Sequence, residues 1–305
     1  MSNDINYSQA QQEMHTLLDM LRWATTTLAA SDLHFGHGTD NPWDEAASLI
    51  LPLLNLPFDM PESVYQARLT SDEKAMICDF LQQRIEQRIP VPYLIKQAWF
   101  CDMPFYVDER VLVPRSPFAE LIKGGFTPWV KDEPGHILDM CTGSGCIAIA
   151  LATLFEDAQV DAVDISADAL TVAETNIYQH QVEDRVWPIQ SNLFTNLAGH
   201  EYDLIICNPP YVDEDDMSDL PDEFKHEPEL GLAAGNDGLD LVRTILQQAP
   251  LHLSDNGWLF VEVGNSQVHM QAEFPELNLE WIELEMGGHG LFAINKRDLL
   301  AVNSH

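Results

Sequence analysis

The sequence predicts an α/β protein whose second half forms a mostly parallel, doubly wound sheet, preceded by a small helical region. Two observations support this fold class. From residue 136 onward, short apolar segments of strand length alternate with longer segments of helical spacing, which is the pattern of successive βαβ units. In the first 92 residues, apolar side chains recur close to the period of an amphipathic helix.

The chain is strongly acidic. Its 305 residues are enough for one large domain or two ordinary ones, and 49 acidic against 15 basic side chains give a formal net charge of −34. Such a surface repels nucleic-acid phosphates and attracts basic partners, so free duplex DNA is a poor candidate substrate. Global acidity that serves solubility or a saline environment explains the charge equally well, and both interpretations stay open.

The composition, with 46% hydrophobic residues, is typical of a soluble protein, and we expect it in the cytoplasm. No stretch approaches the roughly 20 apolar residues of a membrane span, and the N-terminus lacks the pattern of a secretory signal. The five cysteines contain no Cys-x-x-Cys pair, which favours free thiols in a reducing compartment. His34 and His37 lack further clustered ligands, so we expect loop histidines and no metal site.

Three helices are expected in the N-terminal region, over residues 11–28, 42–54 and 70–88. The second begins at Pro42 after Asn41, a cap residue followed by a proline at the first helical position. The third begins at Thr70, which is spaced from Glu73 as in a capping box. Pro90 and Pro92 end it.

A β-hairpin is expected over residues 93–113, because short apolar and aromatic runs replace the helical pattern there. Arg115, flanked by prolines, is either a positioned substrate contact or a simple turn residue. The predicted organisation is therefore a helical substrate-recognition domain over 1–92, a hairpin linker over 93–117 and a sheet domain over 118–305.

The sheet domain is expected to contain seven strands and four helices. The strands are predicted at residues 136–140, 159–164, 185–190, 202–207, 257–263, 280–285 and 290–294, the last two as an antiparallel hairpin. The helices are predicted at residues 145–155, 166–179, 237–252 and 265–273. In such sheets, ligands bind at the carboxyl ends of the strands, where the strand order switches.

A nucleotide-type cofactor is predicted at that edge. Strand 136–140 is followed by a glycine-containing loop, residues 140–145, and then by a helix; glycines let the backbone approach a ligand closely. The loop differs from Gly-x-Gly-x-x-Gly in having Ala at position 148, a version that accommodates NAD, so a dinucleotide stays open but is less favoured. It is not the phosphate loop, which requires Gly-Lys-Ser/Thr. Asp164 ends the next strand, where an acid can accept hydrogen bonds from ribose hydroxyls.

The third strand is followed by Asn192 and Leu193, which could bond the edge of an adenine and pack on its face. An ordinary polar strand exit is the alternative interpretation.

The sequence Asn208-Pro209-Pro210-Tyr211 follows the buried strand 202–207, and we call it the Asn-Pro-Pro-Tyr motif. Neither proline has an N–H, so the motif cannot extend a sheet, and its backbone carbonyls are held in fixed directions. A planar NH2 group could donate one proton to the Asn208 side chain and the other to the Pro209 carbonyl, while Tyr211 covers its plane. A proline-rich turn at a strand end is the plain alternative.

The order of these segments resembles the S-adenosylmethionine-dependent methyltransferases with a seven-stranded Rossmann-like fold. Within them, the Asn-Pro-Pro-Tyr motif is similar to the branch that methylates amino and amide nitrogens. The resemblance implies S-adenosylmethionine as cofactor, with the following residues binding it: Asp139, Cys141, Thr142, Gly143, Ser144, Gly145, Asp164, Ile165, Asn192, Leu193 and Asn208. It also implies Asn208, Pro209 and Tyr211 as catalytic residues, and Pro210 and Arg115 as further substrate contacts.

Across nearly the whole chain, the sequence is similar to the protein glutamine N5-methyltransferases, on residues 90–93, 111–115 and the helical N-terminus. The release-factor branch reads Pro-Arg-x-Asp/Glu-Thr-Glu where this chain has Pro114 to Glu120 without that pattern. Residues 37–46 and 217–221 instead resemble the branch that modifies the third large-subunit ribosomal protein. This implies a basic ribosomal protein as substrate, with neither DNA nor a membrane as partner.

Three other functions stay open. A release-factor glutamine methyltransferase is the nearest alternative. A DNA adenine-N6 methyltransferase would share the core motifs but conflicts with the charge and with the absence of a target-recognition domain. A non-catalytic binding module would be expected to lose Asn208 or the glycine loop, and both are intact.

Overall fold

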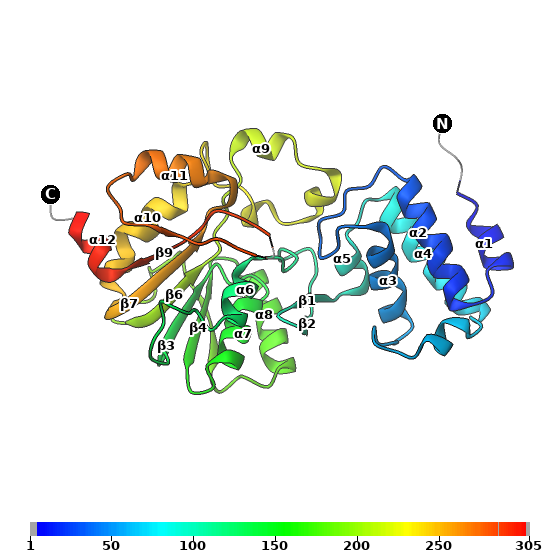
Figure 1. The fold of residues 1–305 in the computed structure, drawn as a ribbon, viewed down its shortest axis with the longest axis horizontal. Coiled ribbons are helices and arrows are strands. Elements are labelled where there is room, and N and C mark those ends of the chain that lie inside the picture. The colour runs from blue at the N-terminus through cyan, green and yellow to red at the C-terminus, as the bar shows by residue number, and fades with distance from the viewer. Residues whose placement is uncertain (1–4, 286, 303–305) are drawn as a thin grey trace. The chain divides into compact units, whose positions relative to one another are not determined.

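The computed structural model describes residues 5–285 and 287–302, and these fold into two units (Figure 1). The first, which we call the helical unit, runs up to Ala98 and also includes Pro221–His226. The second, the sheet unit, comprises Trp99–Leu220 and the chain from Glu227 onward. A short segment that follows the Asn-Pro-Pro-Tyr motif in the sequence therefore belongs to the helical unit.

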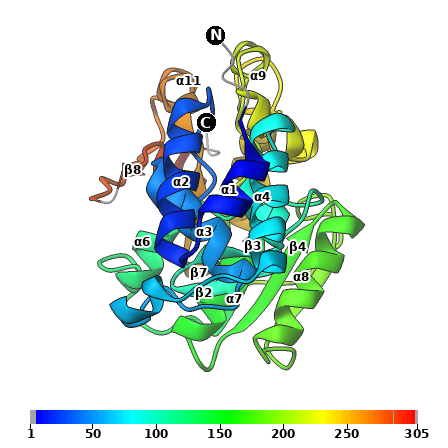
Figure 2. The same ribbon diagram turned by 90° about the vertical axis from the view of Figure 1, so that its right-hand side faces the viewer.

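The helical unit is an assembly of short helices around one apolar core. Its helices are α1 (Tyr7–Glu13), α2 (Leu17–Ala30), α3 (Pro42–Leu53), the 3-10 helix η1 (Glu62–Gln66), α4 (Ser71–Glu86) and α5 (Val91–Ile95). Helix α2 packs on α3, and α1 lies beside α4 (Figure 2). The predicted caps are confirmed: Asn41 accepts hydrogen bonds from the first turn of α3, and Thr70 forms a capping box with Glu73.

The single helix predicted over residues 11–28 is wrong, because the chain breaks between α1 and α2. Thr16 accepts a hydrogen bond from the backbone of Asp19, and the Asp19 carboxylate accepts one from the backbone of Thr16. This second capping box starts a new helix at Leu17. The spacing of Thr16 and Asp19 indicates this helix start in the sequence. The apolar periodicity continues across the break and therefore predicted one helix instead of two.

A buried ion cluster joins three segments of the helical unit. Arg84, 1% exposed, donates to Glu45 Oε1 at 2.5 Å, to Glu223 Oε1 at 3.0 Å and to the His34 carbonyl at 2.8 Å. Both carboxylates are almost fully buried, so the pairing offsets a large desolvation cost. Phe224, next to Glu223, contacts the rings of His34 and His37. These contacts fix Pro221–His226 within the helical unit.

The hairpin is shorter than predicted. Strands β1 (Ala98–Phe100) and β2 (Met103–Phe105) pair across a tight turn in which Cys101 and Asp102 both have positive φ. Residues 111–113 are not a strand. The Val111 N–H donates to the Asp108 carbonyl and the Val113 N–H to the Glu227 side chain, so neither is available for a sheet.

The sheet unit is built on the predicted seven-stranded sheet. The strands are β3 (His136–Met140), β4 (Gln159–Asp164), β5 (Val186–Gln190), β6 (Tyr202–Cys207), β7 (Leu253–Glu262), β8 (Glu280–Trp281) and β9 (Leu291–Asn295). Their order is β5-β4-β3-β6-β7-β9-β8, parallel from β5 to β7 and antiparallel at β9 and β8. The chain moves outward from β3 to β5 and then returns to β6 on the other side of β3. This reversal places the switch point between β3 and β6.

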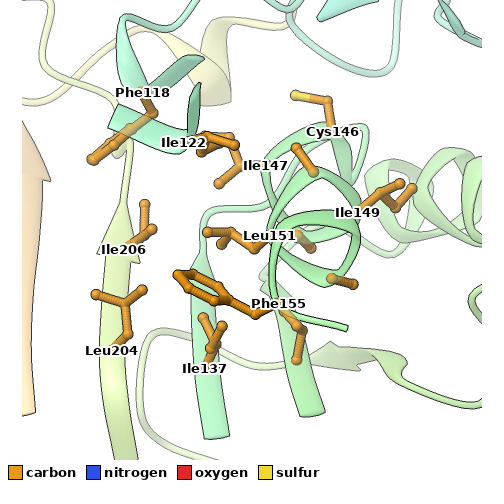
Figure 3. Packing of buried hydrophobic residues seen from close by; sticks show 14 of the residues in the cluster. Phe118, Ile122, Ile137, Cys146, Ile147, Ile149, Leu151, Phe155, Leu204 and Ile206 are labelled. Carbon is orange, nitrogen blue, oxygen red and sulfur yellow. The ribbon is translucent and has the colours of Figure 1, made fainter. Parts of the chain in front are cut away.

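Helices cover both faces of this sheet, as a doubly wound fold requires. One face carries α6 (Phe118–Lys123), α7 (Cys146–Leu154) and α8 (Ala167–Gln179); the other carries α10 (Asp240–Gln248), α11 (Gln267–Glu273) and α12 (Lys296–Val302). Successive residues of β3 point to opposite faces, so Ile137 joins the first core and Leu138 the second. In Figure 3, Leu151 and Phe155 project from the end of α7 toward β3 and β6.

Two predicted elements of this unit are shorter in the structure. The helix expected over 237–252 is α10 followed by the 3-10 helix η4 (Ala249–Leu251), because Gly238 is left-handed and Asp237 accepts from the Leu239 N–H before the helix. The strand expected over 280–285 is only β8, although the Ile282 N–H still bonds the Leu291 carbonyl.

The segment between β6 and α10 has regular structure of its own. It contains α9 (Glu214–Ser218), η2 (Asp222–His226) and η3 (Glu229–Gly231), and a parallel bridge between Val212 and Ala233 closes it. Among the helices of the described residues, none combines the length and apolarity needed to cross a bilayer.

Candidate active site

The site is assembled from the carboxyl ends of four parallel strands. Met140 of β3 is aligned with Val163 of β4 on one side and with Cys207 of β6 on the other. Asp164 of β4 is in turn aligned with Gln190 of β5. Neighbouring strands lie about 4.8 Å apart. The predicted cofactor segments and the Asn-Pro-Pro-Tyr motif therefore meet at one edge of the sheet, on both sides of the switch point.

The glycine loop turns sharply between β3 and α7. Cys141, Gly143 and Gly145 all have positive φ, and the Gly145 N–H donates to the Thr142 carbonyl at 2.9 Å. A Cβ at position 145 would lie 3.2 Å from the Cβ of Ala173 in α8, so a side chain there would crowd the helix. Conformation and close packing both explain the glycine at position 145.

Asp139 is buried beneath this loop. Its Oδ2 atom accepts from Thr142 Oγ1 at 2.5 Å and from the Ala148 N–H at 3.0 Å. Its Oδ1 atom is also buried and has no hydrogen-bond partner within the described residues. Burial raises the pKa of Asp139 to about 7. An unpaired buried carboxylate oxygen is costly to the folded protein, which makes it a candidate acceptor for a ligand donor.

Asp164 connects the second strand to the glycine loop. It accepts from the Gly143 N–H and from the Ser166 N–H, both at 2.9 Å, and burial raises its pKa. Each carboxylate oxygen can accept more than one hydrogen bond, so capacity remains for ribose hydroxyls. The adjacent Ile165 is 48% exposed, which leaves an apolar side chain open at the same edge.

Asn192 and Leu193 follow β5 at this edge. Asn192 is exposed, whereas Leu193 is buried and has a positive φ of 47°. The Ser191 hydroxyl donates to the Leu193 carbonyl at 2.7 Å and fixes the unusual turn. The side chain of Leu193 therefore packs into the core, and the exposed polar group of the pair is Asn192.

The Asn-Pro-Pro-Tyr motif presents one unpaired acceptor. Asn208 Oδ1 is buried and has no hydrogen-bond partner among the residues described, and both prolines after it are buried. The Tyr211 hydroxyl donates to Glu262 Oε1 at 3.0 Å, and the Tyr211 carbonyl accepts from the Ser266 hydroxyl. The motif is thus anchored at the tyrosine and has an open acceptor at the asparagine.

Arg115 is held by a carboxylate of the same unit. Its guanidinium donates to Glu227 Oε1 at 2.6 Å and Oε2 at 2.7 Å, and Glu227 Oε1 also accepts from the Val113 N–H. This two-point pairing fixes the segment before α6. Contact between Arg115 and a substrate stays a prediction.

Two further residues order the site and were not predicted from the sequence. Asn176 in α8, fully buried, donates to the Ser144 carbonyl at 2.8 Å and bonds both the N–H and the carbonyl of Tyr106. Glu262, at the end of β7, accepts from Tyr211. The available signals were an asparagine inside an otherwise regular helix and one acid in the apolar run 257–263.

Comparison with known proteins agrees with this arrangement. The family model described as "Methyltransferase small domain" matches residues 128–227. The chain is 45% identical over 301 residues to the ribosomal protein uL3 glutamine methyltransferase of Francisella tularensis, covering 96% of each chain. It is 47% identical over 293 residues to the protein of the same name from Xanthomonas campestris, covering 96% of this chain and 95% of the relative.

These matches confirm the class I methyltransferase fold and the ribosomal-protein branch predicted from the sequence. Their near-complete coverage includes the helical N-terminal region as well as the sheet. The chain therefore belongs to the ribosomal protein uL3 glutamine methyltransferase family.

Proposed function

We propose that this protein transfers a methyl group from S-adenosylmethionine to the side-chain amide nitrogen of a glutamine in ribosomal protein uL3. The observation that carries this proposal is Asn208 Oδ1, a buried acceptor with no partner in the part of the chain that the structure describes, at the strand switch beside the glycine loop. The names of the relatives give glutamine in uL3 as their target. The two oxygen acceptors of the Asn-Pro-Pro-Tyr motif match the two N–H groups of a glutamine side-chain amide.

The residues present fit this cofactor. Loop 140–145 is shaped by three left-handed residues, and Asp139 Oδ1 is a buried acceptor that has no partner among the described residues. Asp164 would accept the ribose hydroxyls, while Ile165 and Asn192 would contact the adenine. S-adenosylmethionine supplies, when bound, a methyl group on a sulfonium sulfur that is electrophilic without further activation.

The protein's own task is to make a poor nucleophile react. The lone pair of an amide nitrogen is delocalised into its carbonyl. Asn208 Oδ1 and the Pro209 carbonyl, accepting the two N–H bonds, would favour localisation of the pair on nitrogen and set its direction. The prolines keep both acceptors rigid, and the Tyr211 ring would cover the amide plane. Fixed orientation of this kind is worth about 7–11 kcal/mol in favourable cases.

No general base is assigned. The nitrogen becomes more acidic as its bond to the methyl group forms, so the proton can leave late to solvent. Glu262 is the buried carboxylate nearest the motif by hydrogen bonding, but both its oxygens already accept from Tyr211 and Ser116. We therefore propose no catalytic role in proton transfer for it.

We also propose that the substrate is a basic protein that approaches an acidic surface on the segment between β6 and α10. Exposed acids of this segment in the sheet unit include Glu214, Asp216, Asp219 and Glu229. Two acids of this segment are unavailable, since Glu223 is paired with Arg84 and Glu227 with Arg115. Binding of uL3 should weaken as ionic strength rises; binding that is independent of salt would exclude this surface.

The five free cysteines and a ribosomal substrate support a location in the cytoplasm.

Recognition of the substrate by residues 1–92 stays a prediction.

The decisive experiment is transfer of a labelled methyl group from S-adenosylmethionine, offered separately to uL3, a release factor and duplex DNA. Label on uL3 alone, mapped to a glutamine side chain, is the expected result. Label on the release factor would keep the chemistry and overturn the substrate. Label on DNA would overturn both the substrate and the argument from charge.

A further inference from the structure

We propose that Glu262 is a positioning residue for methyl transfer, acting through Tyr211, and that Ser116 in turn fixes Glu262. The inference rests on the proposed function and adds two residues, from β7 and from the segment before α6, to its machinery. Neither is part of the Asn-Pro-Pro-Tyr motif or of the predicted cofactor site.

The Tyr211 ring is held from several directions. The ring hydroxyl donates to Glu262 Oε1 at 3.0 Å, and the backbone carbonyl of Tyr211 accepts from Ser266 Oγ at 3.1 Å. A Cβ added at Gly264 would lie 2.6 Å from Cε2 of the ring, so the ring lies directly against bare backbone. With backbone contact on the ring and a carboxylate at its tip, the plane of the ring is fixed before any substrate arrives.

Glu262 is itself held at both oxygens. It is 4% exposed, and its Oε2 accepts from the Ser116 hydroxyl at 2.6 Å while Oε1 accepts from Tyr211. Ser116 Oγ also accepts from the Phe118 N–H at 3.2 Å, which ties it to the start of α6. Each group in this series of hydrogen bonds, from the Phe118 N–H to the Tyr211 hydroxyl, thus has a defined partner. The Glu262 carboxylate cannot rotate without losing one of its two bonds.

A purely structural role does not account for a carboxylate at this place. Positions 259–261 before Glu262 and Val263 after it are apolar and buried, and an apolar side chain would continue that pattern without desolvating a charge. Burial raises the pKa values of both Glu262 and Tyr211, consistent with their isolation from water. The hydrogen bonds from Tyr211 and Ser116 offset part of this cost, and they fix the tyrosine ring of the motif that contains Asn208.

The chain offers a matched control. Tyr202, at the opposite end of β6, donates its hydroxyl to Asp161 at 2.6 Å. It is the same kind of tyrosine–carboxylate bond in the same unit, but it lies at the start of the strand, remote from the motif. Loss of that bond should affect stability without affecting the reaction.

The first test compares Tyr211→Phe, Glu262→Met and the double variant for kcat, KM for uL3 and cofactor affinity; methionine is similar in length to glutamate but has no oxygen to accept from Tyr211. Each single variant should lower kcat at least about tenfold, which corresponds to about 1.4 kcal/mol, with cofactor affinity within about twofold. The double variant should be no slower than the slower single variant, because each variant removes the same hydrogen bond between Tyr211 and Glu262. Tyr202→Phe should keep the wild-type kcat. Wild-type kcat in Glu262→Met, or fully multiplicative losses in the double variant, would overturn the proposal.

The second test does not depend on the substrate. Ring resonances of Tyr211 and Tyr202 can be followed in tyrosine-labelled protein, assigned by the two phenylalanine variants. Glu262→Met, and the milder Ser116→Ala, should shift or broaden the Tyr211 signals and leave those of Tyr202 unchanged. Unchanged Tyr211 signals would overturn the positioning role. Responsive Tyr211 signals together with no methyl transfer by the wild-type protein would instead show that the proposed function had failed.

Discussion

Asn208→Ala should separate catalysis from folding in this protein. Asn208 Oδ1 is buried and has no hydrogen-bond partner within the described residues, so truncation of the side chain deletes no bond of that atom. It also removes a buried acceptor that is unsatisfied without ligand, a feature that costs the folded state about 1–3 kcal/mol. We therefore expect the free energy of unfolding to stay the same or to rise slightly.

The effect on turnover should be large. One preorganised hydrogen-bonding group directed at the reacting centre is worth about 2.7–4 kcal/mol, or roughly 100-fold to 1,000-fold in kcat. The assay is methyl transfer to uL3 at saturating cofactor, with cofactor affinity measured separately by calorimetry and expected to remain within several-fold. Asn208→Asp keeps an oxygen acceptor and should retain more activity than the alanine variant.

Asn176→Ala provides the opposite control. This side chain bonds Ser144 and both backbone groups of Tyr106, so its loss should lower stability and cofactor affinity together. Near wild-type turnover in Asn208→Ala would refute the role of Oδ1 as an acceptor. A marked loss of stability in that variant would refute the argument that the atom is unpaired.

Three further predictions follow from buried charges. Arg84→Met should lower the free energy of unfolding by about 3–5 kcal/mol, because buried Glu45 loses the Arg84 guanidinium and buried Glu223 keeps only its longer contact with Arg88 at 3.4 Å. Glutamine at positions 45 and 223 should recover most of the loss in urea unfolding, and an unchanged midpoint for Arg84→Met would contradict this account. Asp164→Ala should weaken cofactor binding roughly 10-fold to 100-fold in calorimetry, since hydrogen bonds to a charged acceptor are lost; unchanged affinity would exclude the ribose role. The pKa of Asp139 is raised from 3.8 to about 7, so its contribution to the stability of the cofactor-free protein is complete below pH 3.8 and is lost as the pH rises to about 7. That loss has a limiting slope of about 1.4 kcal/mol per pH unit, which should be absent in Asp139→Asn when unfolding is compared between pH 5 and pH 8.

Local sequence was sufficient wherever a short segment determines its own structure. The apolar run 202–207 ended by two prolines predicted β6 with its observed bounds, and the run before the glycine loop predicted β3. The caps of α3 and α4 followed from side chains two or three residues from the groups they bond. The order of these strand ends was enough to predict one shared edge for the glycine loop, Asp164 and the Asn-Pro-Pro-Tyr motif.

Hydrogen bonds between distant segments could not be predicted in this way. Residues 111–113 have a strand-like composition, but their N–H groups bond Asp108 and Glu227, so no strand forms. Glu223 and Glu227 are four residues apart in one acidic segment, yet Glu223 is buried against Arg84 in the helical unit and Glu227 against Arg115 in the sheet unit.

The sequence by itself therefore determined the fold class and the strand ends that carry the chemistry, because these depend on periodicity and on local backbone chemistry, and its motifs were enough to show the resemblance to the family. Only the tertiary structure decided which polar groups are satisfied. Among residues 5–285 and 287–302, it left Asp139 Oδ1 and Asn208 Oδ1 without partners, and it paired Glu262 with Tyr211 and with Ser116, the latter 146 residues away in the sequence. Burial and hydrogen-bond partners are set by segments that meet only when the chain folds, and no local pattern records them.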